Sequence, residues 1–425
     1  MSSYRALAAT VGAAVLTPLL AVTPGHALMV ADNGTSASTT TATTSQSTTG
    51  TKSTSTKKTS YRIFKRKKAQ SVRIEVLPTI AQAGRTASNA DKAKAVGEVK
   101  FSPAKKGRKA QIEVSPDGKT WSNWGAPRKQ NAKGIVRFTP AAALTGAHWT
   151  YRAQALKAGG LGKFMSGTAT DQWTQVFEDQ FGGTSLNSGI WSTRAPFYDK
   201  GSQRKCSKAS PKMAKVGKGV LQLQVKKDPA RRGDVCKWKK PGTKKKFKFP
   251  YYLNGHVGTD AKFTFRYGTA AARVKFQKPR GMHGSFWMNT SGEPEGRRAV
   301  EIDTVEFFGK GYKDGGLAQF LHHKGRKIGG VQKSANDALK GTDNWWKKFH
   351  VFSVTWTPTG YSFRIDGTET FRTSKAVSDK QVLIILSLLS SDWELDDMPK
   401  SGKGTMKVDW VRVWQHPKFA ARNLQ

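Results

Sequence analysis

A short stretch of the sequence, AVEIDTVEFFG at residues 299–309, places three carboxylates among large apolar residues. Glu301 and Asp303 are two positions apart, so in a strand both side chains point to the same face. Glu306 has the opposite parity, and a β-bulge near Thr304-Val305 would return it to that face. Carboxylates held this close together cannot all ionise easily, so we expect the pKa of at least one of them to rise.

This group of acids is suited to glycoside hydrolysis with retention of configuration. That reaction needs one ionised carboxylate to attack the anomeric carbon and one protonated carboxyl group to protonate the leaving oxygen. A calcium site and a solvated acidic face are the alternative interpretations of the same residues. The spacing of the three acids on an apolar strand favours catalysis.

The strands that must position these acids are predicted from residue 173 onward. Gly and Pro separate segments of strand length. These segments are residues 219–227, 268–278, 284–290, 299–308, 349–357, 361–367, 381–389 and 405–414. The run VLIILSLL (382–389) is apolar on both faces, which predicts a central strand. We therefore expect one all-β domain of about 250 residues, built from two stacked sheets.

With these strands around it, E-I-D-T-V-E resembles the ExDxxE signature of glycoside hydrolase family 16, in the bulged form typical of laminarinases. The resemblance covers about residues 173 to 416, and the other matching segments are FEDQFGGTSLNSGIWSTR (177–194), GHVGTDAKFTFRYGTAAARVKFQKPRGMHGSFWM (255–288), FHVFSVTWTPTGYSFRIDG (349–367) and VDWVRVWQ (408–415). It implies a β-jelly-roll sandwich over residues 173–425. It also implies an endo-acting, retaining hydrolase of β-1,3- or mixed-linked glucan, or of a related galactan.

The resemblance implies a role for each of the three acids. Glu301 would be the nucleophile and Glu306 the general acid/base, while Asp303 would hydrogen-bond the nucleophile. No cofactor is expected for catalysis. The resemblance also implies that Asn254 contacts the sugar and that Asp409 helps to hold a structural calcium ion on the convex face. The opening strand has Asp179-Gln180 where the family usually has Asp-Glu, which leaves the calcium site open.

A glycan cleft needs aromatic side chains that stack on sugar rings, together with hydrogen-bonding groups. Trp287, in the strand before the acids, is the first candidate for stacking, and Trp393 and Trp345 follow it. The chain has 13 Trp, so a core position is the alternative for each of them. His322 and His323 follow the catalytic strand, and His322 is a further candidate for contact with substrate. An incidental pair of histidines is the more common interpretation of such neighbours.

The sequence before residue 173 divides into three parts by composition. Residues 1–27 have a short basic start, an apolar run and small residues at the end, which is typical of an export signal; an uncleaved membrane anchor is the alternative. Residues 28–60 are rich in Ser and Thr and predict a disordered linker. Residues 61–172 alternate at strand length and predict a smaller β-sandwich that resembles immunoglobulin-like and fibronectin type III modules.

The export signal predicts a secreted, extracellular protein. Apart from that signal, the longest apolar run has far fewer than the ~20 residues that a membrane-spanning helix needs. Cys206 and Cys236 are the two cysteines of the chain. In an oxidising compartment we expect them to form a disulfide, and two free buried thiols are the alternative. We expect a monomer.

The net charge of +43 favours polyanionic partners. Because the export signal places the protein outside the cell, we expect an acidic polysaccharide or a wall polymer rather than nucleic acid; a general adaptation of a secreted surface is the alternative. Seven Lys lie in KWKKPGTKKKFK (237–248), directly after Cys236. Such a loop could select acidic substrates, or it could be a solvated charged loop.

Neutral glucan remains the expected substrate. A hydrolase of anionic polysaccharide and a non-catalytic polysaccharide- or cell-wall-binding protein are the alternatives. The three carboxylates favour the enzyme, because a protein that only binds glycan has no need of all of them.

Overall fold

The computed structural model describes residues 69–84, 90–141, 146–290, 299–331 and 344–420. The predicted export signal and linker lie outside these residues. Within the described ranges, no helix combines the length and the apolar character needed to cross a bilayer. The fold is all-β, as predicted. The helices within the described residues are single turns or little more, namely η1 (Ala90–Lys92), η2 (Pro211–Met213), η3 (Pro229–Arg231), η4 (Lys313–Gly315), η5 (Leu395–Asp397) and α3 (Pro417–Ala420).

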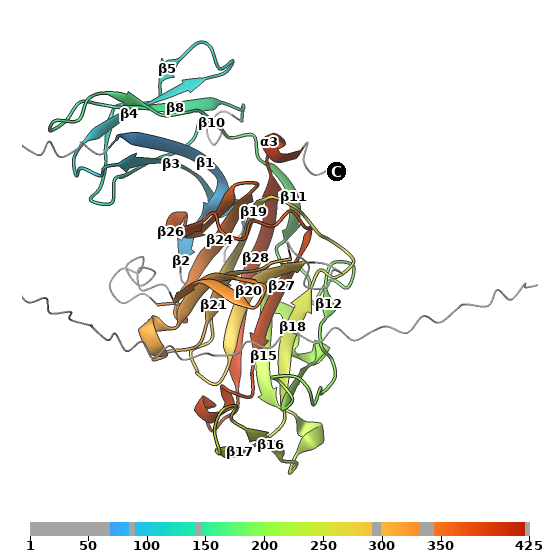
Figure 1. Cartoon of the computed structure of the whole chain (residues 1–425). Coiled ribbons are helices and arrows are strands. Elements are labelled where there is room, and N and C mark those ends of the chain that lie inside the picture. Colours follow the sequence, from blue (N-terminus) through green and yellow to red (C-terminus); the bar gives the residue numbers. More distant parts are fainter. Residues whose placement is uncertain (1–68, 85–89, 142–145, 291–298, 332–343, 421–425) are drawn as a thin grey trace, which may run out of the picture.

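The N-terminal part forms two small sheets around a core of its own (Figure 1). One sheet has the order β1 (Ser71–Ala81), β3 (Lys94–Ser102) and β7 (Ile135–Phe138). The other has the order β10 (Ala169–Thr170), β8 (Thr150–Ala155), β4 (Lys109–Ser115) and β5 (Ser122–Asn123), with β6 (Arg128–Lys129) beside β4 and β9 (Phe164–Met165) beside β8. Alternate apolar residues such as Ile74, Val99 and Ile112 fill the space between them. The resemblance of this part to immunoglobulin-like modules stays a prediction.

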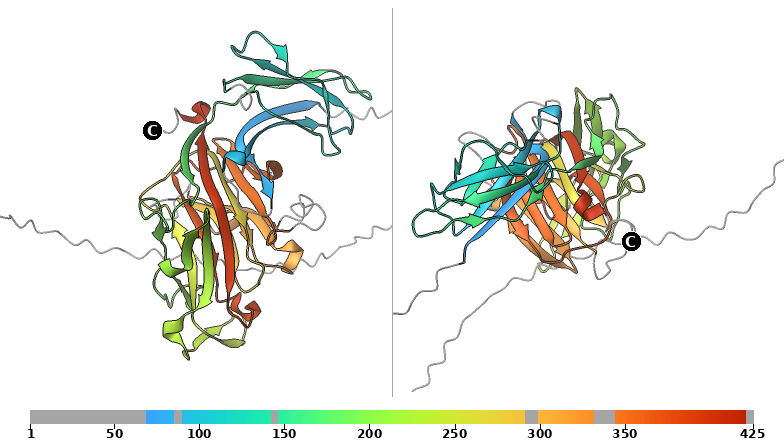
Figure 2. Two further views of the ribbon diagram at one scale, coloured as in Figure 1. Left: turned by 180° about the vertical axis from the view of Figure 1, so that it is seen from behind. Right: turned by 90° about the horizontal axis from the view of Figure 1, so that it is seen from above.

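The larger part of the chain is a sandwich of two sheets (Figures 1 and 2). In the first sheet, one side of β28 (Gly404–Gln415) pairs with β11 (Thr174–Asp179) and with β15 (Val220–Lys227). On the other side of β28 the order is β19 (Gly268–Lys275), β24 (Phe349–Thr357), β25 (Gly360–Ile365) and β26 (Thr368–Thr373). The second sheet has the order β12 (Ser192–Thr193), β18 (Tyr252–Gly258), β27 (Val382–Leu389), β20 (His283–Thr290), β21 (Glu301–Phe307), β22 (Leu317–His323) and β23 (Arg326–Val331). We call it the acid-bearing sheet.

Short strands close one edge of this sandwich. β18 also pairs with β15 and with β13 (Ser207–Ala209), so the two sheets form a nearly closed structure. β14 (Ala214–Gly217) pairs with β15, while β16 (Cys236–Lys239) and β17 (Lys246–Phe249) form a separate hairpin. The sheets enclose one large apolar core, and β27 is buried along its whole length between β18 and β20. The prediction that VLIILSLL is a central strand is therefore confirmed.

The N-terminal part packs on the outer face of the first sheet, away from the acid-bearing sheet. Leu77 and Ile80 join Val351 and Trp410 in a small apolar cluster. The short strand β2 (Ala83–Gly84) extends the contact by pairing with β24. Charged groups surround the cluster, since Glu75 forms ion pairs with arginines of β25 and β26. This packing leaves the opposite face of the sandwich free for the acids.

Candidate active site

β21 carries the three predicted acids, and its register reveals a bulge. On β20, Phe286 pairs with Val305 but the next residue, Trp287, pairs with Asp303, so Thr304 is an extra residue in β21. The same irregularity appears in the pairing with β22, between Asp303 and Glu306. The predicted bulge is thus confirmed. Because alternate residues of β20 pair with the three acids, all three lie on one face of the sheet.

The three carboxyl groups differ in exposure. The side chains of Glu301 and Glu306 are 32% and 16% exposed, whereas that of Asp303 is only 3% exposed. Burial raises the pKa of Asp303 well above its usual range, and the neighbouring charges of Glu301 and Glu306 raise it further. The central acid therefore holds its proton to higher pH than a free carboxyl group, and in that form it can donate a hydrogen bond to a neighbouring carboxylate.

Glu306 lies in a polar setting built by β20 and by the loop after β27. Ser285 Oγ donates a hydrogen bond of 3.2 Å to Glu306 Oε1. His283 Nε2 lies 4.0 Å from the same oxygen, and His283 Nδ1 lies 2.6 Å from Glu394 Oε2. The backbone N–H of Ser391 donates to that second carboxylate at 3.0 Å. These contacts connect the predicted acid/base to a buried His–Glu pair.

The buried His–Glu pair keeps a positive charge near Glu306. Burial alone would lower the pKa of His283, but the charge of Glu394 and its hydrogen bond outweigh this effect, and the pKa is raised. Arg204 opposes the protonation of His283 through its charge, and His256 is the other ionisable group that faces it. The sequence analysis missed this pair. The signal was the alternation of His283, Ser285 and Trp287 along one apolar strand.

Two of the predicted tryptophans are placed where they can stack on a sugar. Trp287 is half-buried on the face of the acids, and its Nε1 donates to Ser387 Oγ at 3.1 Å. Its ring lies nearly parallel to that of His256, with centroids 6.1 Å apart. Trp393 is 41% exposed and lies nearly parallel to the ring of His283 at 6.2 Å. Their contact with substrate stays a prediction.

His322 reaches the acids from β22, where it pairs with Glu301. Its Nε2 lies 3.9 Å from both Glu301 Oε1 and Asp303 Oδ2. Burial and the charge of Lys327 lower the pKa of His322 to about 4, so the ring is neutral near pH 7. Atoms of Glu301, Asp303 and His322 that could ligate a metal lie within 4.8 Å of one another. The same atoms can hydrogen-bond a sugar. His323 instead contacts the backbone carbonyl of Ala299.

Two other predicted substrate contacts are not available. Trp345 is 1% exposed and packs in the large core against Phe352, so the expectation that it stacks on sugar is wrong. Asn254 is 2% exposed, and its amide donates to Ser207 Oγ and accepts from Ser390 N and Oγ. Its carboxamide is therefore engaged in joining two segments of the chain, and the expectation that it contacts sugar is also wrong.

Asp409 does not have the surroundings of a calcium ligand. It is buried on β28, and its Oδ2 accepts a hydrogen bond of 2.6 Å from Nη1 of Arg273 on β19. Calcium is bound by six to eight oxygen ligands. A guanidinium group beside the carboxylate supplies the compensating positive charge and excludes a cation from that position. The residues around Asp409 therefore do not fit calcium.

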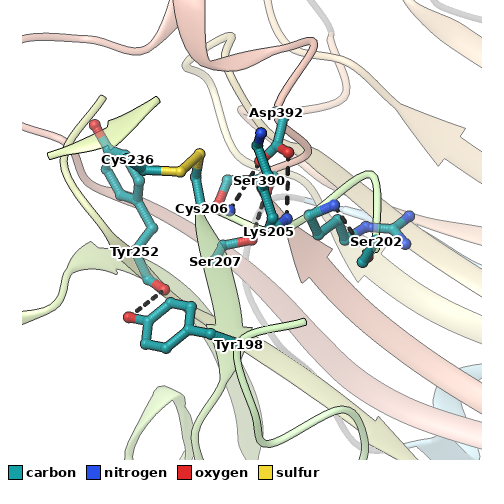
Figure 3. Close-up of a disulfide and its surroundings, with 10 residues drawn as sticks. Tyr198, Ser202, Lys205, Cys206, Ser207, Cys236, Tyr252, Ser390 and Asp392 are labelled. Carbon is teal, nitrogen blue, oxygen red and sulfur yellow. Dashed lines mark hydrogen bonds between the residues drawn. A yellow bond between two sulfur atoms is a disulfide. The ribbon is translucent and has the colours of Figure 1, made fainter. Parts of the chain in front are cut away.

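The predicted disulfide is present and supports one border of the site (Figure 3). Cys206 and Cys236 are bonded, with their Cα atoms 5.5 Å apart. The backbone N–H groups of Lys205 and Cys206 donate to the carboxylate of Asp392. Asp392 directly precedes Trp393 and Glu394, so the β16–β17 hairpin is joined through the disulfide to the loop that bears the stacking ring and the buried His–Glu pair.

Comparison with protein families matches residues 204–412 to the model described as Glycosyl hydrolases family 16. The matched range contains all three acids, and it supports the family predicted from the ExDxxE motif. No curated protein matches the chain.

Three solved structures illustrate the structural likeness. The catalytic domain of an endo-1,3-beta-glucanase (laminarinase) from Thermotoga petrophila RKU-1 is 18% identical, with 58% of this chain and 98% of that one covered and a TM-score of 0.45. The laminarinase catalytic domain from Thermotoga maritima MSB8 is 19% identical, with coverages of 58% and 99% and a TM-score of 0.46. The endo-beta-1,3-glucanase from Pyrococcus furiosus is 22% identical, with coverages of 57% and 94% and a TM-score of 0.45. Identities this low say nothing about the substrate of this chain.

Proposed function

We propose that this protein is a retaining endo-β-glucanase of glycoside hydrolase family 16 that hydrolyses β-1,3- or mixed-linked glucan. The observation that carries the proposal is the bulge in β21, which brings Glu301, Asp303 and Glu306 to one face of the acid-bearing sheet. The family match over residues 204–412 supports the assignment to the glycoside hydrolases. The mechanism and the substrate are the parts that need an experiment.

In this proposal the reaction has two steps. Glu301 attacks the anomeric carbon while Glu306 gives its proton to the leaving glycosidic oxygen, which forms a glycosyl-enzyme ester. Glu306 then takes a proton from water, the water oxygen attacks the anomeric carbon, and the ester bond to Glu301 breaks. Two displacements on one carbon retain its configuration. Such a mechanism needs the two carboxyl groups about 5–5.5 Å apart.

The surrounding groups support these two steps. A protonated Asp303 can donate a hydrogen bond to Glu301 and hold the nucleophile in its attacking orientation. Ser285 donates to Glu306 and fixes its carboxyl group. The neutral ring of His322 can exchange a hydrogen bond with a sugar hydroxyl, and Trp287 and Trp393 offer ring faces for stacking.

The proposal includes secretion. The Cys206–Cys236 disulfide supports it, because such bonds form and persist in oxidising compartments. The N-terminal 27 residues supply the predicted signal. Mass spectrometry of the protein in the culture medium of expressing cells would test this by showing whether residues 1–27 have been removed. A protein that stays inside the cell and retains residues 1–27 would contradict secretion.

The function is tested by measuring reducing sugars released from laminarin, lichenan, galactan, agar and carrageenan. Glu301→Gln and Glu306→Gln should each lower turnover by at least about 10²-fold while binding of the glycan persists, because the lost groups act on the transition state. Proton NMR of the first product should show the β-anomer. Initial release of the α-anomer would overturn the retaining mechanism. Binding with no hydrolysis of any glycan by the parent would favour the non-catalytic binder.

A further inference from the structure

β16 and β17 form a hairpin at one end of the sandwich (Figure 1). Its register places four lysines on one face. In its register Lys237 is opposite Lys248, and Lys239 is opposite Lys246. All four side chains are exposed. We call this surface the four-lysine face. We propose that it is a binding site for anionic polysaccharide, separate from the catalytic cleft.

Like charges directly opposite each other weaken an antiparallel pair, and this hairpin contains two such pairs in succession. None of the four lysines forms an ion pair with a carboxylate among the residues that the structure describes. The repulsion is therefore left uncompensated within the described chain. A polyanion lying along the face would neutralise it, which gives binding a favourable term beyond ordinary surface attraction.

The opposite face of the hairpin holds the lysines in place. Trp238 and Phe247 pair across the strands with ring centroids 5.5 Å apart, and Phe247 stacks on Phe249 at 5.7 Å. These rings pack against the large core of the sandwich. The disulfide of Cys236 fixes the first strand covalently to Cys206. A platform fixed in this way loses less conformational entropy on binding than a free lysine-rich loop would.

The spacing of the four-lysine face suits a polymer with repeated charges. Lysines two apart on a strand are separated by about 6.5–7 Å, and those opposite each other by about 5 Å. The turn continues the positive surface through Lys240 and Lys244, which with Lys239 border an open hollow of about 430 Å³. A single small anion would engage only part of this row. A chain that bears a carboxylate, sulfate or phosphate on each repeat would engage all of it.

The inference that the bound polyanion is a polysaccharide rests on the proposed function. The disulfide and the hydrogen bonds to Asp392 tie the hairpin to the segment around Asp392 (Figure 3). The same loop continues into Trp393 and Glu394, at the border of the proposed active site. A polymer held by the hairpin would therefore be held next to the cleft. The chemistry shared by the candidate glycans is a repeated anionic group, and the test separates uronate from sulfate.

The test compares two variants of equal charge in a Glu301→Gln background, so that hydrolysis does not affect the measurement. The first replaces Lys237, Lys239, Lys246 and Lys248 with Gln. The matched control replaces four exposed lysines of the N-terminal part with Gln, namely Lys106, Lys119, Lys129 and Lys133. Affinity electrophoresis with polygalacturonate, λ-carrageenan, laminarin and a double-stranded DNA oligonucleotide, at ~0.02 M and ~0.15 M salt, measures binding.

The proposal expects the hairpin variant to lose at least about tenfold in affinity for polygalacturonate or λ-carrageenan at low salt, and the control less than about twofold. Binding to laminarin should be unchanged in both. Equal losses in both variants would show that net charge alone matters and would overturn the site. DNA binding that is tighter than binding to either polyanionic glycan, and that the hairpin variant loses, would overturn the assignment to glycan.

Two further readouts separate this proposal from misfolding and from the proposed function. The hairpin variant should melt at the same temperature as the parent or higher, because two like-charge pairs are removed. With Glu301 restored, it should hydrolyse a neutral glucan like the parent. If no glucan is hydrolysed by any form but the affinity loss is found, the four-lysine face stands and the proposed catalytic activity fails.

Discussion

His283 Nδ1 lies 2.6 Å from Glu394 Oε2, and both side chains are buried. The other ring nitrogen lies 4.0 Å from Glu306 Oε1. A histidine held between two carboxylates stays protonated to higher pH than a free one, as the raised pKa of His283 indicates. The predicted acid/base therefore has a neighbour that stays cationic to higher pH than a free histidine would.

Replacing His283 with Asn should change the pH dependence of catalysis. The variant removes the ionisation of His283, whose pKa is raised and whose ring lies beside Glu306, so the alkaline limb of the kcat/KM profile should move. We expect kcat to fall by roughly 10–100-fold, because the carboxyl group also loses its positioning. The measurement is a pH profile of kcat/KM on whichever glucan the parent hydrolyses.

His350→Asn is the matched control for this experiment. His350 is also buried and pairs with a carboxylate, with its Nδ1 2.8 Å from Asp366 Oδ2, but it lies on β24 in the other sheet. Its loss should lower the melting temperature without moving the alkaline limb. If both variants lose activity equally and the alkaline limb of the kcat/KM profile moves in neither of them, His283 has only a structural role.

Asp303→Asn should make the protein less active and more stable. The raised pKa of Asp303 means that folding favours its protonated form, so its contribution to stability is fully present below the unfolded pKa and is lost as the pH rises toward the folded pKa. Asn mimics the protonated carboxyl group at every pH. The gain in melting temperature over the parent should therefore be small near pH 4 and grow as the pH rises to 7 and above. A variant that is destabilised by the same amount at all pH values would contradict the raised pKa.

The placement of the three acids on one face was predictable because the signal for it is local. Alternation alone placed Glu301 and Asp303 on one face, and the parity of Glu306 required the bulge that the structure contains at Thr304. The pairing of the two cysteines is predicted from their number and from the expected export, and the disulfide is present. Export itself stays a prediction. These predictions depend on a few residues or on the number of cysteines, and not on how distant segments meet.

The errors arise where distant segments meet. His283 and Glu394 are 111 positions apart, and only the loop after β27 brings them together. The resemblance implied that Asn254 contacts sugar, but the segment of Ser207 and the residues after β27 cover it. Trp345 is buried in an irregular segment. Such a segment has no strand or helix periodicity from which its burial could be predicted. A sequence pattern predicts on which face of a sheet a side chain lies. Whether that face is exposed to solvent depends on how loops from distant parts of the chain pack over it.

Removing the disulfide should destabilise the protein by about 3–4 kcal/mol, the value expected for closing a loop of about 30 residues in the unfolded chain. The Cys206→Ser/Cys236→Ser double variant avoids a free thiol. Urea unfolding with and without reductant measures the effect, and the parent in reductant should resemble the variant in either condition. A variant as stable as the oxidised parent would show that the hairpin and the Asp392 loop hold together without the bond.

Arg273 and Asp409 form a buried ion pair. The two side chains are 1% and 3% exposed. Each charge therefore offsets part of the free-energy cost of burying the other. Arg273→Met leaves the carboxylate buried without this partner and should lower the free energy of unfolding by roughly 3–5 kcal/mol. The exposed pair of Arg280 and Asp397 gives the control, since Arg280→Met should cost less than about 1 kcal/mol. Because the guanidinium already supplies the positive charge, a chelator should leave the melting temperature of the parent unchanged. A fall in that temperature with chelator, reversed by added calcium, would show that the pair opens to bind the ion.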